Sequence, residues 1–134
     1  MCFFLCKRCN SKISMYNDIF SMSKGNLAGN YCNPAGYIHE TICFYKVIES
    51  STRMIDRPST DFSWFPGYAW QIALCSKCST HVGWKFIAVS KNLKPRMFFG
   101  LSGKSLTIDA TTKPSLEDDE EQQSEDNVTE ADDD

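Results

Sequence analysis

Two cysteine pairs of identical spacing constrain this chain more than any other feature. Cys6 and Cys9 form one C-x-x-C motif, and Cys75 and Cys78 form the other. In each motif two thiolates can reach one metal ion, and two such turns that meet give the tetrahedral four-sulfur site typical of structural zinc. We therefore predict zinc as a structural cofactor, with an extended β insertion between the motifs.

Disulfides and a site that includes His81, three residues after Cys78, are the alternatives to this zinc site. Disulfides fit less well, because the seven cysteines are an odd number and the chain has the character of a cytosolic protein. Four sulfur ligands leave no position for water, so the metal is expected to be structural and not catalytic. The remaining cysteines, Cys2, Cys32 and Cys43, are expected to be small buried apolar side chains.

All three tryptophans lie within 21 residues, at Trp64, Trp70 and Trp84. They either fill a common core or form the walls of a pocket. As walls, indoles bind a cation through the ring quadrupole, or a compact ring whose polar edge finds backbone donors and acceptors. A cation cage gains from a nearby carboxylate, and Asp61 is the one acidic residue close to these tryptophans in sequence. A neutral guest therefore fits the sequence at least as well as a cation.

The segments that carry two of the tryptophans have the pattern of β-strands. Residues 68–74 and residues 84–89 alternate with period two, and the second cysteine motif is the turn between them. Folding the chain back about Lys77 places Trp70 opposite Trp84 as a direct cross-strand pair.

The segment before these strands contains a Pro66–Gly67 dipeptide. This dipeptide predicts a type II turn within a wider loop that brings Trp64 and Trp70 together. Ser63, Gly67 and Gly83 are positions at which the backbone can approach a ligand closely, which favours the pocket slightly over the common core.

The rest of the chain indicates a mostly β fold. Aromatic and β-branched residues predict strands over 18–22, 37–48 and 97–101, and residues 57–60 predict a turn. We find no segment with a convincing helical period.

Charge divides the chain into two parts. Residues 117–134 contain 11 of the 17 acidic residues and no basic one, a composition too polar to bury a core. Residues 1–108 carry 13 lysines and arginines against five acidic residues, a net charge of +8. We expect a folded domain over 1–108 and an acidic disordered tail over 109–134. The basic domain is compatible with nucleic acid, although a solvated surface screened by its own tail is the simpler interpretation.

Catalysis and membrane insertion are not expected. No Ser-His-acid set is evident, and the two histidines are His39 and His81. One class of methionine sulfoxide reductases shares a four-cysteine zinc and a β fold, but needs a later nucleophilic cysteine, and none follows Cys78. No apolar run reaches membrane-spanning length and no signal peptide is recognisable, so we expect a cytoplasmic or nuclear protein.

Three further motifs resemble a known family. NPAGYIHET (33–41), IDRPSTDFSWFPGYAW (55–70) and HVGWKF (81–86), together with the C-x-x-C motifs, closely resemble the thalidomide-binding (CULT) domain family of cereblon over residues 4–108. The resemblance implies a β-tent of two antiparallel sheets that meet near the zinc site. It also implies a tryptophan cage that binds glutarimide and related cyclic imides, and a link to the ubiquitin pathway.

The resemblance assigns roles to individual residues. It implies that the cage walls are Trp64, Trp70 and Trp84, with Phe86 at the base. Backbone groups of Phe62 and Trp64 would hydrogen-bond the imide, with Ser63 between them. Asn33 would border the ligand, and Asn33 and His39 match positions that contact partner proteins recruited over it. A natural guest of this chemistry is a cyclised C-terminal Gln or Asn of a damaged protein.

The sequence departs from the vertebrate pattern of this family at two positions. Phe62 and Ala35 stand where the family usually has histidine. The first change leaves the imide contact intact, because backbone groups make it, whereas the second bears on partner recruitment. The family's Lon-like domain and its ligase-docking helical region have no counterpart in this chain. The chain is therefore either a stand-alone member of the family or an excised domain, and we expect a stand-alone member.

Overall fold

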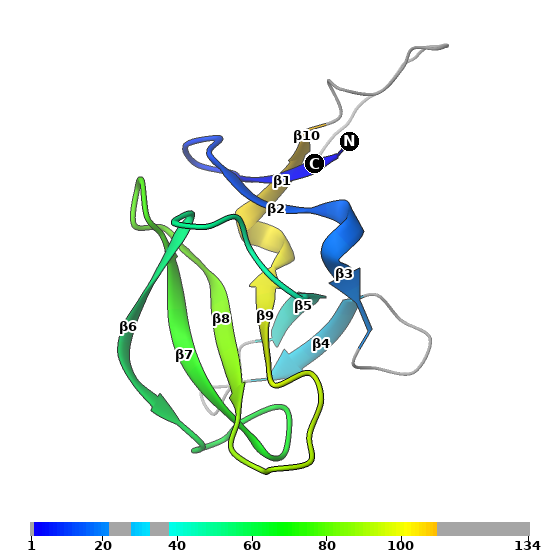
Figure 1. Cartoon of the computed structure of the whole chain (residues 1–134). Helices are drawn as coiled ribbons and strands as arrows, with labels where there is room; N and C mark the ends of the chain where they lie inside the picture. Colours follow the sequence, from blue (N-terminus) through cyan, green and yellow to red (C-terminus); the bar gives the residue numbers. More distant parts are fainter. Residues whose placement is uncertain (1, 22–27, 33–37, 110–134) are drawn as a thin grey trace.

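The computed structural model describes residues 2–21, 28–32 and 38–109. Within these residues the regular elements are ten strands and two short 3-10 helices, η1 (Tyr16–Asp18) and η2 (Gly103–Ser105). The strands form two antiparallel sheets (Figure 1). The predicted mostly β fold of two antiparallel sheets is therefore confirmed. Neither helix of the described part has the length or the apolar character needed to cross a membrane.

The smaller sheet has three strands in the order β10–β1–β2, with bounds Leu106–Asp109, Phe3–Cys6 and Lys12–Met15. The first cysteine motif is the turn between β1 and β2. Phe3 lies opposite Asp109 and Cys6 lies opposite Leu106, so residues about a hundred positions apart in sequence form one ladder. Strand β1, which we did not predict from the sequence, is therefore the central strand of this sheet.

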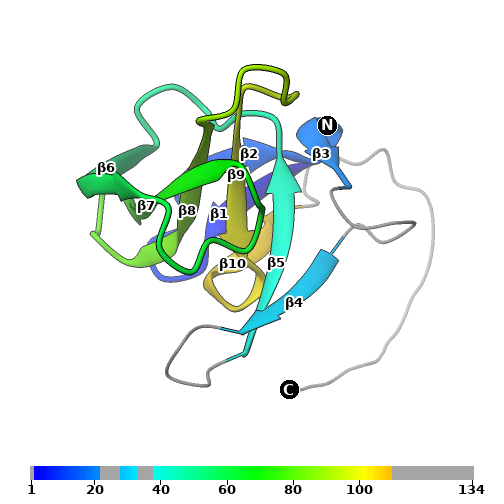
Figure 2. The same cartoon turned by 90° about the horizontal axis from the view of Figure 1, so that it is seen from below.

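The larger sheet has seven strands, in the order β3–β5–β9–β8–β7–β6, and β4 also pairs with β5 (Figure 2). Their bounds are β3 Ile19–Phe20, β4 Ala28–Cys32, β5 Ile38–Phe44, β6 Thr52–Ser59, β7 Tyr68–Cys75, β8 His81–Ala88 and β9 Met97–Ser102. The second cysteine motif is the turn between β7 and β8. Both cysteine motifs thus lie at the tips of hairpins, one in each sheet.

The large sheet packs differently on its two faces. Phe99 and Leu101 of β9 join the buried cluster that also contains Phe4 and Ile13 of the small sheet. Phe98 lies on the opposite face of β9. It belongs to a second buried cluster, which contains the tryptophans. The small sheet lies across one end of the large sheet, so the first cluster fills the space between them (Figure 1). The tryptophan cluster therefore stands apart from the core that joins the sheets.

Strands β7 and β8 confirm the two predicted strands, but the predicted direct pair of Trp70 and Trp84 is wrong. Phe86 lies opposite Trp70, and Ile72 lies opposite Trp84. Two shifts of one residue combine here. The turn pairs Leu74 with His81, one position beyond a fold about Lys77, and a β-bulge at Val82, which has no partner in the ladder, adds the second shift. The two indoles are therefore diagonal neighbours on one face of the sheet.

Two other expected segments have different bounds. The strand predicted over 37–48 ends at Phe44, because the chain then turns toward the small sheet. There Tyr45 N–H donates to the Asp18 carbonyl at 2.8 Å and Ile48 N–H donates to the Ile13 carbonyl at 2.7 Å. The strand predicted over 18–22 shortens to β3, since η1 occupies Asp18. The strand predicted over 97–101 is confirmed as β9.

The turn predicted over 57–60 is wrong, because β6 continues to Ser59. The ladder with β7 is irregular between Ile55 and Ser59, and Asp56 has a φ of 65°. Pro58 lies within this irregular stretch, where its missing N–H removes no ladder hydrogen bond. A proline that signals a turn in the sequence is here accommodated by a bulged strand.

Gly83 and Gly67 face neighbouring protein segments, which corrects the expected role of these glycines in approaching a ligand. A Cβ at Gly83 would overlap the Gly100 carbonyl oxygen and lie 2.7 Å from the Leu101 Cα. A Cβ at Gly67 would overlap the side chain of Leu93. Gly83 is therefore required for the close approach of β8 to β9.

Gly83→Ala is expected to lower the free energy of unfolding by about 1–3 kcal/mol, because the added methyl meets rigid backbone in a packed sheet. Urea denaturation measures the change. Gly103→Ala is the matched control, since its Cβ would meet the end of the flexible Glu40 side chain, 2.9 Å from Oε1. Equal losses for the two variants would contradict this account of Gly83.

Candidate functional site

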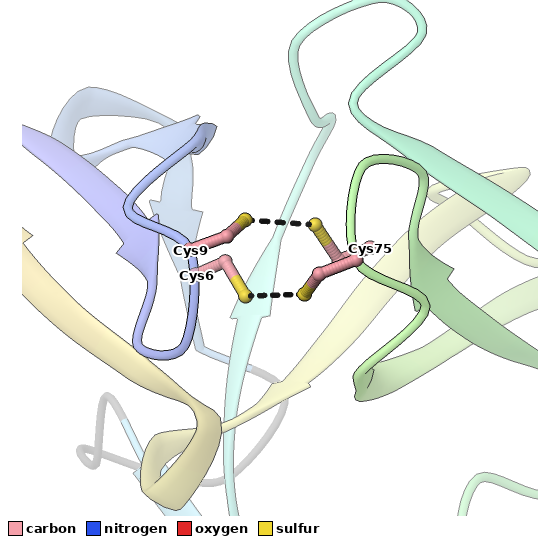
Figure 3. A group of neighbouring side chains, drawn as sticks. Cys6, Cys9 and Cys75 are labelled. Atoms are coloured by element: carbon pink, nitrogen blue, oxygen red, sulfur yellow. Dashed lines mark hydrogen bonds between the residues drawn. The ribbon is translucent and has the colours of Figure 1, made fainter.

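The two hairpin tips bring four cysteine sulfurs together (Figure 3). The Sγ of Cys6 lies 3.6 Å from that of Cys78, and the Sγ of Cys9 lies 3.6 Å from that of Cys75. All four sulfurs lie within 4.8 Å of one another. Four sulfurs bound tetrahedrally to zinc would lie about 3.8 Å apart, given a Zn–S distance of about 2.3 Å. The predicted ligand set is thus assembled, and it fits a zinc ion.

The two turns have the same backbone structure. In the first, Asn10 N–H donates to the Cys6 carbonyl at 2.7 Å and Cys6 N–H donates to the Ser11 carbonyl at 2.8 Å. The second turn repeats both bonds at 2.8 Å, through Ser79, Cys75 and Thr80. The residue after each motif has a positive φ, which is 64° at Asn10 and 65° at Ser79. Equal spacing in the sequence therefore produces two equivalent metal-binding turns.

Hydroxyl groups contact the sulfur of the second cysteine in each turn. Ser11 Oγ lies 3.3 Å from Cys9 Sγ, and Thr80 Oγ1 lies 3.0 Å from Cys78 Sγ. Ser11 and Thr80 occupy the same position, two residues after the second cysteine of each motif. Our sequence interpretation did not include them, although this shared offset is visible in the sequence.

These surroundings separate the pKa values of the cysteines. The Ser11 hydroxyl lowers the pKa of Cys9 to about 6, and the Thr80 hydroxyl lowers the pKa of Cys78. Burial raises the pKa of Cys6 to about 11. A metal ion that binds all four sulfurs must therefore displace the proton of Cys6, whereas Cys9 offers a thiolate already at neutral pH.

His81 lies outside the cysteine cluster, so the alternative ligand set with His81 is wrong. Its Nε2 lies 2.9 Å from the Gly83 carbonyl oxygen. Its ring contacts Trp84 edge to face, with 4.8 Å between the ring centroids. This histidine belongs to the surroundings of the tryptophans.

The other three cysteines differ in burial. Cys43 is buried, as predicted, in the tryptophan cluster. Cys2 is half-buried, and the side chain of Cys32 lies outside the described residues. Neither Cys2 nor Cys43 belongs to the metal-binding group.

The three tryptophans and Phe86 lie in one aromatic cluster. Trp64 contacts Trp84 edge to face at 4.8 Å between centroids, and Trp64 and Phe86 are 6.4 Å apart. Phe86 and Trp84 are buried, whereas Trp64 and Trp70 are half-buried. The Pro66–Gly67 turn is of type II, as predicted, with Tyr68 N–H donating to the Phe65 carbonyl at 3.0 Å and a φ of 90° at Gly67.

The loop before Trp64 is held by specific hydrogen bonds. The Trp70 indole N–H donates to the Asp61 carbonyl at 2.7 Å. Ser63 N–H donates to the Thr60 carbonyl at 3.3 Å, and Ser63 Oγ donates to the Phe65 carbonyl at 3.1 Å. Ser63 therefore supports the loop from within.

Phe62 has a strained position in this loop. Its side chain is 76% exposed and its φ is 57°, a left-handed conformation that is rare for a bulky residue. Such strain is concentrated at functional sites in proteins. Of the predicted partner-contact positions, Asn33 lies outside the described residues, and His39 is placed only as the residue of β5 opposite Tyr31.

Comparison with protein families shows to which family the chain belongs. The family model described as "Yippee zinc-binding/DNA-binding /Mis18, centromere assembly" matches residues 2–121. The chain belongs to the Yippee/Mis18 family. Membership in a zinc-binding family agrees with the assembled cysteine cluster, and the domain is a zinc-binding module by this relationship.

Individual relatives confirm the resemblance to cereblon. Protein cereblon of Drosophila melanogaster is 52% identical over 105 residues, which cover 78% of this chain and 18% of that protein. Protein cereblon of Drosophila virilis is 50% identical over 110 residues, 82% of this chain and 17% of that protein. This Yippee/Mis18 domain therefore spans less than a fifth of the length of these relatives.

Proposed function

We propose that this domain is a zinc-stabilised binding module whose tryptophan cluster binds cyclic imides of the glutarimide type. The strained, exposed Phe62 beside the tryptophans is the observation that carries the proposal. Phe62 follows Asp61, whose carbonyl accepts from the Trp70 indole N–H, and in this proposal the backbone of this segment supplies the hydrogen-bond partner that an imide needs. The similarity of the chain to cereblon supports this assignment.

Zinc has a structural role in this proposal. Cys6, Cys9, Cys75 and Cys78 would hold the ion and so tie the two hairpin tips together. A four-sulfur site supplies no open position for chemistry. We therefore propose no catalytic activity for the domain.

The chemistry of the imide suits an aromatic site. Its methylene groups would pack on the faces of Trp64, Trp70 and Trp84, and its N–H and carbonyls would bond backbone groups of Phe62 and Trp64. Each buried methylene contributes about 0.8 kcal/mol, and each hydrogen bond in a dry site about 1 kcal/mol. After the entropy cost of association, these contributions correspond to a Kd on the order of micromolar.

The natural guest that fits this chemistry is a cyclised C-terminal Gln or Asn of a protein. A peptide with such an end would place its preceding residues outside the tryptophan cluster. Asn33 and His39 are the proposed contacts for recruited partners. We extend the proposal to a role in the ubiquitin pathway on the basis of the similarity to cereblon, of which the chain spans 18% in the melanogaster protein. We propose a cytoplasmic or nuclear location for these encounters.

Titration with a fluorescent glutarimide probe tests the proposal. We expect saturable binding with a Kd on the order of micromolar. The N-methylated probe is the matched control, because it keeps the apolar ring and lacks the imide donor. Equal affinity for the two probes, or no binding of either, would contradict imide recognition.

Nucleic-acid binding is the second candidate, because the description of the family includes DNA binding. The net charge of +8 over residues 1–108 is compatible with it. Titration with labelled single-stranded and duplex oligonucleotides distinguishes the candidates. Binding that weakens steeply with salt and strengthens when residues 117–134 are removed would favour nucleic acid over the imide.

A further inference from the structure

The hydroxyl groups beside the cysteine cluster differ between the two otherwise equivalent turns. Ser11 Oγ lies 3.3 Å from the sulfur of Cys9, in its own turn, and 3.3 Å from the sulfur of Cys75, in the opposite turn. Thr80 Oγ1 contacts the sulfur of Cys78, in its own turn, at 3.0 Å. Within the described residues, Thr80 forms no equivalent bond to the opposite turn. In the part of the chain that the structure describes, Ser11 alone therefore connects the two hairpin tips through a side-chain hydroxyl.

We propose that Ser11 is a positioning residue for the metal centre, which holds the sulfurs of Cys9 and Cys75 at the separation that a bound ion requires. The proposal rests on the zinc site of the proposed function. Cys9 and Cys75 are one of the two closest sulfur pairs between the turns, at 3.6 Å. Ser11 Oγ is thus within hydrogen-bond distance of both members of a pair whose two cysteines lie on hairpins of different sheets.

The physical reason is the charge of the site. Four thiolates and one divalent ion carry a net charge of −2, so the sulfurs repel one another and gain from nearby donors. A hydroxyl has one proton, which it donates to one thiolate at a time, and Ser11 is close enough to serve either of two. Groups that hydrogen-bond metal ligands typically change metal affinity by about 10- to 100-fold when they are removed. Loss of the Ser11 hydroxyl should therefore weaken the site more than loss of the Thr80 hydroxyl.

Competition with a chromophoric zinc chelator measures this effect in the full-length chain. We expect Ser11→Ala to weaken zinc binding about tenfold or more and to speed zinc release. Thr80→Val, which removes a hydroxyl at constant volume, should have a smaller effect. Ser11→Thr should retain near wild-type affinity, since threonine is already accommodated at the equivalent position of the second turn. Ser105→Ala is the matched control, because its hydroxyl donates to the His81 carbonyl at 2.9 Å and contacts no cysteine.

Cobalt substitution tests the role of Ser11 separately from the existence of the metal centre. The absorption of a cobalt–thiolate complex should show four sulfur ligands in wild type and in Ser11→Ala, with a shifted charge-transfer band in the variant. An intact four-sulfur spectrum with unchanged zinc affinity in Ser11→Ala would overturn the proposed role of Ser11 but not the metal centre. An equal or larger effect of Thr80→Val would do the same. A wild-type chain without any cobalt–thiolate absorption would overturn both the metal centre and this inference.

Discussion

Cys75→Ser is expected to abolish metal binding and to unfold most of the domain. Cys75 is fully buried, and its sulfur lies 3.6 Å from that of Cys9 in the other sheet. Structural zinc contributes about 10–16 kcal/mol to the folding of small domains. That contribution is as large as the whole stability of a typical domain, about 5–15 kcal/mol. Metal analysis and thermal melting followed by circular dichroism measure the loss.

Cys2→Ser is the matched control for this variant. Cys2 is half-buried and lies outside the metal-binding group, so one zinc per chain and a nearly unchanged melting temperature are expected. A strong chelator added to wild type should reproduce the effect of Cys75→Ser. Retention of one zinc per chain by Cys75→Ser, with the melting temperature of wild type, would refute the four-cysteine centre.

Trp84→Ala is expected to abolish binding of the glutarimide probe, with a loss of affinity of at least 100-fold. The indole would provide one wall of the site and also supports Trp64, which contacts it at 4.8 Å. Trp84 is 9% exposed, so its removal also leaves a cavity that costs about 3–5 kcal/mol of stability. Binding must therefore be measured below the melting temperature of the variant, after its zinc content has been verified.

Trp70→Ala keeps this test independent of folding. Trp70 is half-buried, and its truncation removes a proposed wall at a smaller cost to the core. Tyr45→Ala is the control, because Tyr45 is an exposed aromatic residue that stacks on Phe20 at 4.1 Å. A folded Trp70→Ala variant with the affinity of wild type would show that the tryptophans only fill a core.

The sequence was most informative where structure is local. The spacing of the cysteine motifs predicted all four members of the cluster, because two residues between cysteines place both sulfurs on one side of a tight turn. The period of two predicted β7 and β8 for a similar reason. The type II turn followed from the order of proline and glycine at Pro66–Gly67.

The failures concern pairing between distant segments. Strand β1 pairs with β10, which lies about a hundred residues away, and each has only four residues, too few for a periodic pattern to be distinctive. The register of Trp70 and Trp84 depends on a bulge at Val82 that no local signal indicates. Pro58 suggested a turn, whereas an irregular strand accommodates it.

The pairing of Phe3 with Asp109 makes the described domain suitable for circular permutation. Neighbouring strands in a sheet lie about 4.8 Å apart, so a few glycine and serine residues would bridge these two positions. New termini could then be opened in an exposed loop, such as the one around Lys91 and Asn92 between β8 and β9. In that topology, reporters fused to the permuted chain would stand on the side of the tryptophans, at the opposite end of β8 from the second metal-binding turn (Figure 1).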